Sequence, residues 1–347
     1  MEVVELFSTP EMSIYLCVLA GVLGLVMGSF LTCAAGRMVA GESFLTGRSH
    51  CDACNRELDA LDLIPVLSWL FSRGRCRHCG AHLSALYPVS ELVCALMYVS
   101  IVAHFGFSGT TLEYLILASV LFCVAMTDLL GYIIPNGLVL FGIGAWALLR
   151  VCFAFAGVEQ PVEAITSGLV SALVISVPVL LLALVLERLR GKAALGGGDV
   201  KLLFMVGLYF SWPLALLGLF LACVIGIVIG VAGRGVLAQQ GEDEAASPVV
   251  PATPASPVVP AAPAAPAVAA PTASPTTPAE HASPAVPAAP VSPATPSISS
   301  ETAKSTTQNV EKPVSSALIP FGTAIAIAFW ITICEGMQIL GWYLALF

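Results

Sequence analysis

The sequence predicts an all-α polytopic membrane protein with about eight transmembrane helices. Of its 347 residues, 58% are hydrophobic and only 10% are charged, whereas a soluble domain carries about 25% charged residues. Long apolar runs recur along the chain, and about 20 such residues in a helix cross the roughly 30 Å of hydrocarbon in a bilayer. Since lipid cannot satisfy a backbone hydrogen bond, each crossing segment is expected to be a helix.

Eight apolar segments qualify as spans. The first follows an acidic N-terminal stretch without a basic region, so we interpret it as a retained helix and not as a cleaved signal peptide. The sixth is short and begins in a cluster of glycines. The predicted spans are residues 13–36, 86–105, 112–130, 132–155, 163–186, 196–210, 213–232 and 318–346.

The lysine and arginine residues predict the orientation of these spans. When successive loops are assigned to alternate sides, 13 of the 14 basic residues fall on one side or near it, and Arg150 is the exception. Cytoplasmic loops are enriched in lysine and arginine. We therefore expect both termini outside, and the basic loop at residues 37–85 in the cytoplasm.

One segment has a composition unlike the rest. Residues 241–316 contain 16 of the 24 prolines. Such a sequence cannot pack a core and favours extended polyproline II structure, so we expect a disordered linker. The expected divisions are a first helix, a basic loop, a membrane core, this linker and a last helix, at residues 1–36, 37–85, 86–235, 241–316 and 317–347.

Two aspartates are the candidate catalytic residues. Asp128 ends the third apolar segment, in the sequence AMTDLLGYIIPN at residues 125–136, and Asp199 begins the sixth, in GGGDVK at residues 196–201. An acid in an apolar segment is costly unless it is paired or hydrated, so a functional role is the first hypothesis. The alternative is that each acid only marks a loop boundary. The predicted orientation places both at the cytoplasmic face.

Two carboxylates that share a shielded site resist ionising together, so one keeps a proton. The ionised acid can activate water, and the protonated acid can donate its proton to a leaving amine. Such a pair hydrolyses a peptide bond without a metal ion or a nucleophilic side chain. The glycines at residues 196–198 permit backbone angles that other residues avoid, which would let the helix break and a substrate backbone approach Asp199.

An ion-coupled transporter is the alternative from another functional class. Membrane aspartates beside broken helices also form proton or cation sites, but those sites lie near the midplane and often between inverted repeats. Asp128 and Asp199 are predicted at one face, and no pair of inverted halves is visible in the sequence. These features favour the hydrolase.

The basic loop contains two C-x-x-C pairs, Cys51 with Cys54 and Cys76 with Cys79, separated by 21 residues. Each pair can present two thiolates to one ion, and two pairs complete a tetrahedral structural zinc site. Disulfides are not expected in a cytoplasmic loop. A redox pair or uncommitted cysteines are the alternatives.

Together these residues resemble those of bacterial type IV prepilin peptidases, which are bifunctional leader peptidase and N-methyltransferase enzymes. The Asp128 segment and the G-x-G-D motif that ends at Asp199 resemble the family's two catalytic segments. The resemblance covers nearly everything outside residues 241–316. Further matching segments are Gly28–Leu31 with Arg37, Arg48–Cys51, Ile64–Leu70, Arg73–Cys76, Tyr87–Glu91 and Ile319–Gly322.

The resemblance implies that Asp128 and Asp199 cleave prepilins or pseudopilins with short basic leaders, for a type IV pilus or a protein secretion system. It implies zinc at the four cysteines. It also implies methylation of the new N-terminus with S-adenosyl-L-methionine, with Glu91, Arg37 and Gly28 at the cofactor site. We expect the bacterial inner membrane as the location, membrane lipid as a partner, and no nucleic acid.

The chain departs from the family at several positions. Thr32 stands where the family often has asparagine, Asp62-Leu63 where it has Asp-Asn, and Thr323 where a proline often follows the glycine. The first two departures lie in the half associated with methylation. Cleavage without methylation is therefore the alternative within this family.

Overall fold

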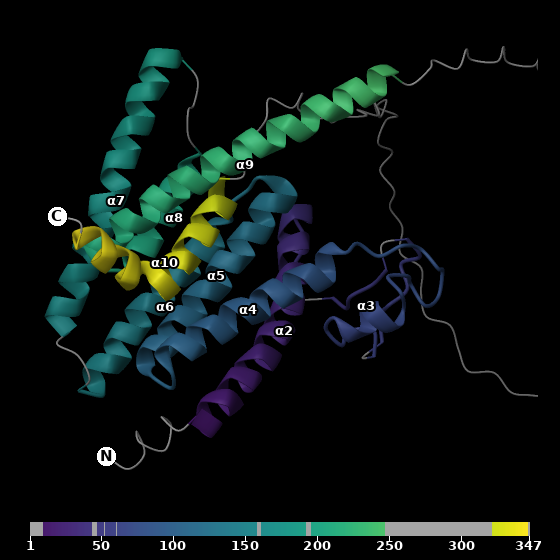
Figure 1. Ribbon diagram of the computed structural model, residues 1–347, viewed down its shortest axis with the longest axis horizontal. Helices are drawn as coiled ribbons and strands as arrows, with labels where there is room; N and C mark the ends of the chain where they lie inside the picture. The colour runs from purple at the N-terminus through teal and green to yellow at the C-terminus, as the bar shows by residue number, and fades with distance from the viewer. Residues whose placement is uncertain are drawn as a thin grey trace, which may run out of the picture. The chain divides into compact units, whose positions relative to one another are not determined.

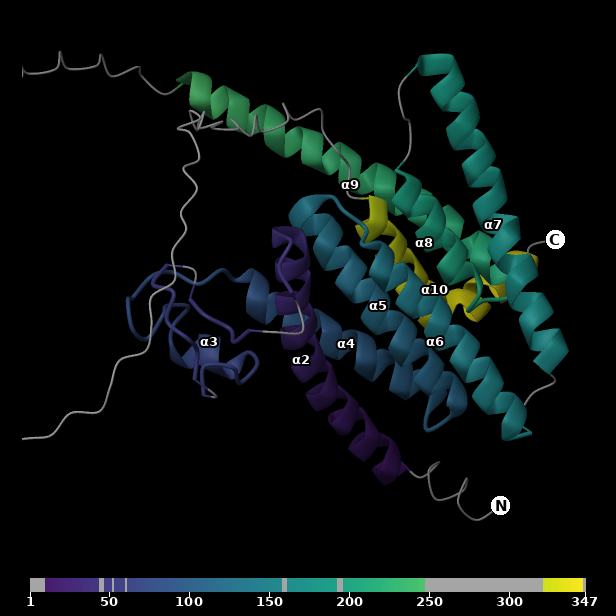
Figure 2. The same ribbon diagram turned by 180° about the vertical axis from the view of Figure 1, so that it is seen from behind.

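The structure, a computed structural model, consists of helices and connecting loops, and its described ranges contain no strand. Figures 1 and 2 show the helices from opposite sides. The described residues are 10–43, 47–51, 53–59, 61–157, 161–191, 196–246 and 321–345. The helices are α2 (Pro10–Ala40), α3 (Leu67–Phe71), α4 (Leu86–Phe105), α5 (Gly109–Gly131), α6 (Asn136–Phe155), α7 (Pro161–Arg190), α8 (Gly197–Gly207), α9 (Trp212–Ala246) and α10 (Phe321–Leu344).

Seven of the described helices are long and apolar enough to cross a membrane, which confirms the predicted polytopic membrane protein. The predicted sixth span differs from the others. Helix α8 has 11 residues, so it extends about 16 Å at 1.5 Å per residue, roughly half of the hydrocarbon thickness. Where eight spans were predicted, the described residues form seven spanning helices, and the short α8 takes the place of the predicted sixth span.

Local sequence sets both ends of α5, the helix that carries Asp128. Ser108 caps its beginning, because the Ser108 hydroxyl accepts a hydrogen bond from the backbone N–H of Thr111 over 3.1 Å. At the other end, Tyr132 has a φ of 54°, and its N–H bonds to the carbonyl oxygen of Asp128 over 2.9 Å. Pro135 has no N–H and interrupts the hydrogen-bond ladder, so α6 begins only at Asn136.

Helix α5 lies at the centre of the helix packing. It contacts α2, α4, α6 and α10, and its Leu117, Leu121 and Val124 side chains are fully buried. Small residues bring α2 close to α4, since a Cβ on Gly24 would lie 2.6 Å from Cα of Ala95. Glycines of this kind permit close approach of membrane helices.

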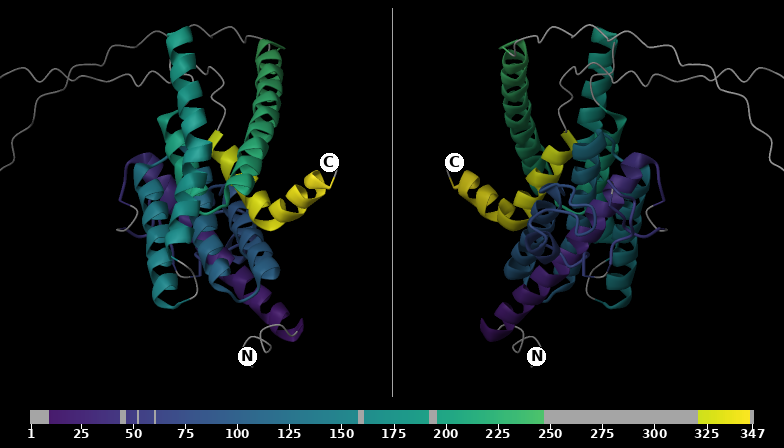
Figure 3. Two further views of the ribbon diagram at one scale, coloured as in Figure 1. Left: turned by 90° about the vertical axis from the view of Figure 1, so that its left-hand side faces the viewer. Right: turned by 90° about the vertical axis from the view of Figure 1, so that its right-hand side faces the viewer.

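The short helix α8 packs against α6, α7 and α10. Gly207 contacts α7 so closely that a Cβ there would lie 2.5 Å from Cα of Ala172. Figure 3 shows that α10 changes direction within its length. Phe329 in its first half is fully buried, whereas Met337 and Trp342 in its second half are exposed. The first half of α10 is therefore part of the core.

The described helices belong almost entirely to one unit of the chain, Met1–Glu242 with Ser315–Phe347. The second unit, Asp243–Val314, is described only at its first four residues, which continue α9. The linker predicted at 241–316 thus lies outside the described residues from 247 onward. Its disorder stays a prediction.

Candidate active site and metal centre

Several helix ends meet at one end of the membrane helices. Val39, near the end of α2, packs on Gly131 at the end of α5, where a Cβ would lie 2.7 Å from the Val39 side chain. Lys201 of α8 donates a hydrogen bond over 3.0 Å to Oδ1 of Asn136, the first residue of α6, although 65 residues separate the two. The end of α5 and the beginnings of α6 and α8 therefore lie near one another.

Asp128 lies in the last turn of α5 and is only 5% exposed. Its Oδ2 accepts a hydrogen bond from the backbone N–H of Thr323 over 2.8 Å. The Thr323 hydroxyl lies 3.3 Å from this oxygen and 3.2 Å from the carbonyl oxygen of Ala125, so its one proton can be donated to either. The backbone N–H of Gly322 also donates to this carboxylate. A side chain at position 322 would crowd the acid, because a Cβ there would lie 3.0 Å from Asp128 Oδ2. The beginning of α10 thus supplies hydrogen-bond donors to an acid on α5.

Asp199 lies in the first turn of α8, directly after the glycine cluster. Its side chain is half-buried, and a Cβ on Gly196 would lie 3.0 Å from Asp199 Oδ2. An acid in the first turn of a helix interacts favourably with the positive end of the helix dipole. The glycine at 196 leaves the space that the Asp199 carboxylate occupies.

Asp128 and Asp199 lie near enough for their charges to interact. Ile134 lies beside both segments, since its side chain is 3.1 Å from the Cβ position of Gly198 and 3.3 Å from that of Gly322. Helix α10 packs on both α5 and α8. The structure therefore brings together the two acids that the sequence singled out. Carboxylates in such an arrangement favour sharing one proton, which provides a base and an acid side by side.

The four cysteines of the basic loop also lie together. The Sγ atoms of Cys51, Cys54, Cys76 and Cys79 are all within 4.8 Å of one another, and those of Cys51 and Cys79 are 4.0 Å apart. A zinc ion with tetrahedral Zn–S bonds of about 2.3 Å places its sulfurs about 3.8 Å apart. The cluster thus has the size and the donor set that one such ion requires.

Each cysteine pair occupies a tight turn. In the second turn, the backbone N–H of Cys76 donates to the carbonyl oxygen of Ala81 over 2.8 Å, and the N–H of Gly80 donates to the carbonyl oxygen of Cys76 over 2.9 Å. The first pair has the matching hydrogen bonds. Backbone N–H groups of Cys79 and His78 lower the pKa of the Cys76 thiol to about 7, because they stabilise the thiolate. The thiolate, which is the form that binds a metal ion, is thus favoured at Cys76, whereas burial and the neighbouring Cys76 thiol raise the pKa of Cys79 to about 11.

Comparison with known proteins identifies the family. The model of the type IV leader peptidase family matches residues 115–231, and that of the bacterial peptidase A24 N-terminal domain matches residues 22–105. A prepilin leader peptidase/N-methyltransferase of Bacillus subtilis (strain 168) is 32% identical over 211 residues, which cover 61% of this chain and 80% of the relative. The chain belongs to the type IV leader peptidase family.

Other members of the family match similar lengths of the chain. A prepilin leader peptidase/N-methyltransferase of Stutzerimonas stutzeri is 30% identical over 269 residues, covering 71% of this chain and 89% of the relative. One of Myxococcus xanthus (strain DK1622) is 33% identical over 239 residues, covering 67% of this chain and 69% of the relative. No solved structure shows a significant match.

The residues predicted for methylation lie where the basic loop of this family member meets α2 and α4. Glu91 of α4 is buried, and its Oε2 accepts a hydrogen bond over 2.6 Å from the backbone N–H of Val66, whose φ is 59°. Gly28 of α2 packs directly on Glu91, where a Cβ would lie 2.9 Å from Glu91 Cα. Arg37 donates from Nη1 to the carbonyl oxygen of Gly47 over 3.3 Å. Cofactor binding by these residues stays a prediction.

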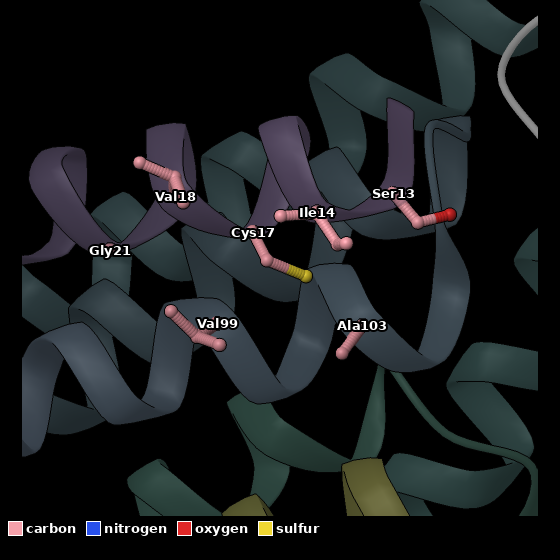
Figure 4. A pocket seen from close by; sticks show the side chains of 7 residues that line it. All are labelled: Ser13, Ile14, Cys17, Val18, Gly21, Val99 and Ala103. Atoms are coloured by element: carbon pink, nitrogen blue, oxygen red, sulfur yellow. The ribbon is translucent and has the colours of Figure 1, made fainter. Parts of the chain in front are cut away.

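A hollow of about 510 Å³ lies elsewhere, between α2 and α4 (Figure 4). It is almost entirely apolar, and the Ile14 and Val18 side chains that line it are exposed on a spanning helix. It contains none of the predicted site residues, so we interpret it as a crevice that faces lipid. The lining residues are Ser13, Ile14, Cys17, Val18, Gly21, Val99 and Ala103.

Two features of the structure were not predicted from the sequence. The first is the contact of Thr323 with Asp128, since Thr323 stood out only as a departure from the family and no sequence pattern signals that its backbone reaches Asp128. The second is the buried ion pair between Glu113 of α5 and Arg150 of α6. The sequence could have indicated this ion pair. Arg150 is the one basic residue that does not fit the distribution of lysine and arginine over the predicted cytoplasmic loops, and Glu113 is an acid in an apolar segment. Charges inside membrane segments usually pair with one another.

Proposed function

We propose that this chain cleaves the leader peptide from type IV prepilins or pseudopilins at the cytoplasmic face of the bacterial inner membrane. The observation that carries the proposal is the approach of Asp128 and Asp199, with Thr323 donating to the Asp128 carboxylate. Membership of the leader peptidase family supports the same activity.

In this proposal the two aspartates divide the acid and base work. The ionised carboxylate takes a proton from water, and the water oxygen attacks the carbonyl carbon of the scissile peptide bond. The protonated carboxyl group gives its proton to the leaving nitrogen as the C–N bond breaks. Gly322 and Thr323 fix the orientation of the Asp128 carboxylate during both steps.

The orientation of the site is also a proposal. Arg37 lies in the last turn of α2, and Arg188 and Arg190 lie in the last turn of α7. Lys201 is bonded to the beginning of α6. Because basic residues favour the cytoplasmic side, we place this end of the helices in the cytoplasm. Helix α2 ends and α10 begins at this end, so both termini are placed outside, which requires the short α8 to return the chain between α7 and α9. The apolar segment of the substrate would then lie in the bilayer, with its basic leader beside the aspartates.

We propose zinc as the ion held by Cys51, Cys54, Cys76 and Cys79. Four thiolates at these separations suit zinc, and such sites are structural because no coordination position stays open. When bound, the ion would join the two turns and contribute to the folding free energy of the loop.

We propose S-adenosyl-L-methionine as the donor for methylation of the new N-terminus. This cofactor supplies an activated methyl group when bound. Glu91 and Arg37 offer charged groups of both signs near the junction of the loop with α2 and α4, and these suit the charged amino-acid part of the cofactor. Gly28 would act through packing, because α4 already occupies the space above its Cα.

The test is co-expression of a pilin precursor with the wild-type chain, with Asp128→Asn or with Asp199→Asn, followed by mass spectrometry of the pilin N-terminus. Each variant should leave the leader attached, because an amide can neither accept nor supply the proton. Asp59→Asn, which changes an exposed acid of the basic loop, is the matched control and should process the precursor normally.

Equal amounts of each variant in the membrane fraction would exclude failed insertion as the cause. Normal processing by either Asp128→Asn or Asp199→Asn would refute the assignment. The same spectra report a mass increase of one methyl group on the mature N-terminus, so they also separate a peptidase with methyltransfer from a peptidase alone.

A further inference from the structure

The basic loop carries a group of exposed apolar side chains that lies outside the seven spanning helices. Phe71 is the most exposed of them, at 77%. A contiguous exposed apolar surface on a loop marks contact with a membrane or another molecule. The group, named here the α3 apolar face, consists of Leu61, Leu63, Ile64, Leu67, Leu70 and Phe71.

The α3 apolar face belongs to an ordered turn and not to a frayed segment. Trp69 points inward, where its ring covers Gly74 so closely that a Cβ there would lie 2.8 Å from it. Its Nε1–H donates to the carbonyl oxygen of Leu83 over 3.4 Å. Leu67 and Phe71 are four residues apart and so share a face of the helix. One side of α3 therefore holds the loop together, while the other is exposed.

A hydrogen bond ties the beginning of α3 to the spanning helix α4. The N–H of Val66, the residue before α3, donates to the buried carboxylate of Glu91 over 2.6 Å. Glu91 lies five residues after Leu86, the first residue of the spanning helix α4, which corresponds to about 7.5 Å along the axis. Figures 1 and 2 show α3 beside this end of α4. Helix α3 thus begins beside the first two turns of a membrane helix.

Positive charge adjoins the α3 apolar face. Arg73 and Arg75 follow α3 directly and are exposed. The ion pairs recorded among the described loop residues involve Arg48 with Glu57 and Arg77 with Asp62. Apolar side chains flanked by arginine match the interfacial layer of a bilayer, where acyl chains meet anionic headgroups.

We propose that the α3 apolar face lies in the interfacial layer of the membrane from which α4 emerges, with Arg73 and Arg75 on anionic phospholipid headgroups. This contact would hold the four-cysteine loop flat against the bilayer surface. The occupant is the lipid surface, because the Val66–Glu91 bond places the face at membrane height and the adjoining charge is complementary to anionic headgroups. The inference does not depend on the catalytic assignment.

The full chain tests this proposal in lipid nanodiscs. A fluorescent, environment-sensitive amino acid is incorporated either at position 71 or, as the control, at position 57, where Glu57 is an exposed residue of the same loop. The nanodiscs contain phosphatidylcholine alone or with phosphatidylglycerol, and some lipids carry bromine on the upper acyl chain. Position 71 should show blue-shifted emission and several-fold stronger quenching by brominated lipid than position 57.

Phosphatidylglycerol should increase quenching at position 71, and Arg73→Gln with Arg75→Gln should remove that increase. Equal metal content in all variants would show that the loop is folded. Water-like emission at position 71 with quenching no greater than at position 57 would overturn the proposal. So would shielding of position 71 that appears only when a pilin precursor is added, because the face would then be a protein-binding surface. If phosphatidylglycerol does not change the quenching at position 71, the proposed contact of Arg73 and Arg75 with anionic headgroups would be refuted.

Discussion

Thr323 presents two hydrogen-bond donors to the carboxylate of Asp128, although the two residues are 195 positions apart in the sequence. One donor is the backbone N–H and the other is the side-chain hydroxyl, which also lies 3.2 Å from the carbonyl oxygen of Ala125. Together with the N–H of Gly322, they serve the carboxylate of an acid that is otherwise in an apolar helix. The acid and its donors come from opposite sides of the predicted linker in the sequence.

Replacement of Thr323 by valine should lower the rate of precursor cleavage. Valine keeps the backbone N–H and the shape of the side chain but removes the hydroxyl donor. A hydrogen bond to a charged group contributes about 1.5–3 kcal/mol. The 3.3 Å distance and the competing carbonyl oxygen of Ala125 at 3.2 Å place this one at the weak end, so we expect at most roughly a tenfold loss in kcat/KM. Thr323→Ser retains the donor and should restore most of the rate. Equal rates for the serine and valine variants would show that the hydroxyl has no role.

Gly322→Ala should also lower the rate of precursor cleavage. The added Cβ would lie 3.0 Å from Asp128 Oδ2 and 3.1 Å from its Cγ, so the carboxylate must shift by a few tenths of an ångström. A displacement near 1 Å at a reacting group costs on the order of 100-fold in rate, so this smaller shift should cost roughly tenfold or less. The control is Gly341→Ala in the same helix, where nothing lies within 4 Å of the new Cβ. This variant should cleave the precursor at the wild-type rate. Full activity of Gly322→Ala would mean that the Asp128 position is not critical.

Removal of two cysteines from the cluster should release the metal and loosen the loop. We expect Cys51→Ser with Cys76→Ser to contain no zinc by atomic emission, and to be cut faster by protease within residues 47–85, because metal binding supplies folding free energy. The control is Cys152→Ser with Cys223→Ser, since both residues are exposed and lie outside the cluster. Unchanged protease resistance in the cluster variant, together with no bound metal, would contradict a structural metal.

Two substitutions of Glu91 separate its charge from its contact with the loop. Glu91→Gln keeps an oxygen that can accept from the N–H of Val66, whereas Glu91→Ala leaves that N–H without its partner, at a cost of about 1–3 kcal/mol. Hydrogen exchange at residues 64–72 should therefore accelerate only in the alanine variant. If the charge serves methylation, mass spectrometry will find both variants without the methyl group. If the Glu91→Gln variant still methylates the pilin, the charge of Glu91 has no role in methylation, and the residue serves only to bind the loop through Val66.

The sequence was sufficient for features that depend on composition or local spacing. The apolar segments predicted the seven spanning helices because each is long enough by itself, and the cysteine spacing predicted a cluster whose members lie on one loop. The predicted sixth span was too long. Leu208–Phe210 are apolar like the residues before them, so the sequence does not show that α8 ends at Gly207.

Features that depend on the packing of distant segments could not be predicted from the sequence. The N–H donors of Thr323 and Gly322 are backbone groups, and every residue except proline carries one. Helix α3 was missed because five residues are too few for a periodic pattern. Val66, the residue before α3, is β-branched and has a φ of 59°. Its N–H bonds to Glu91 of α4, 25 positions away in the sequence, and no local pattern signals this contact.

The order of synthesis gives the contact between Thr323 and Asp128 a further meaning. A ribosome makes Asp128 early and must add 195 more residues before Thr323 exists, so the acid enters the bilayer without its donors. The proposed hydrolase can then mature only after its last helix has been inserted. A nascent chain that stalls within the proline-rich stretch would lack the Gly322 and Thr323 donors, and so would not yet have the arrangement proposed for cleavage.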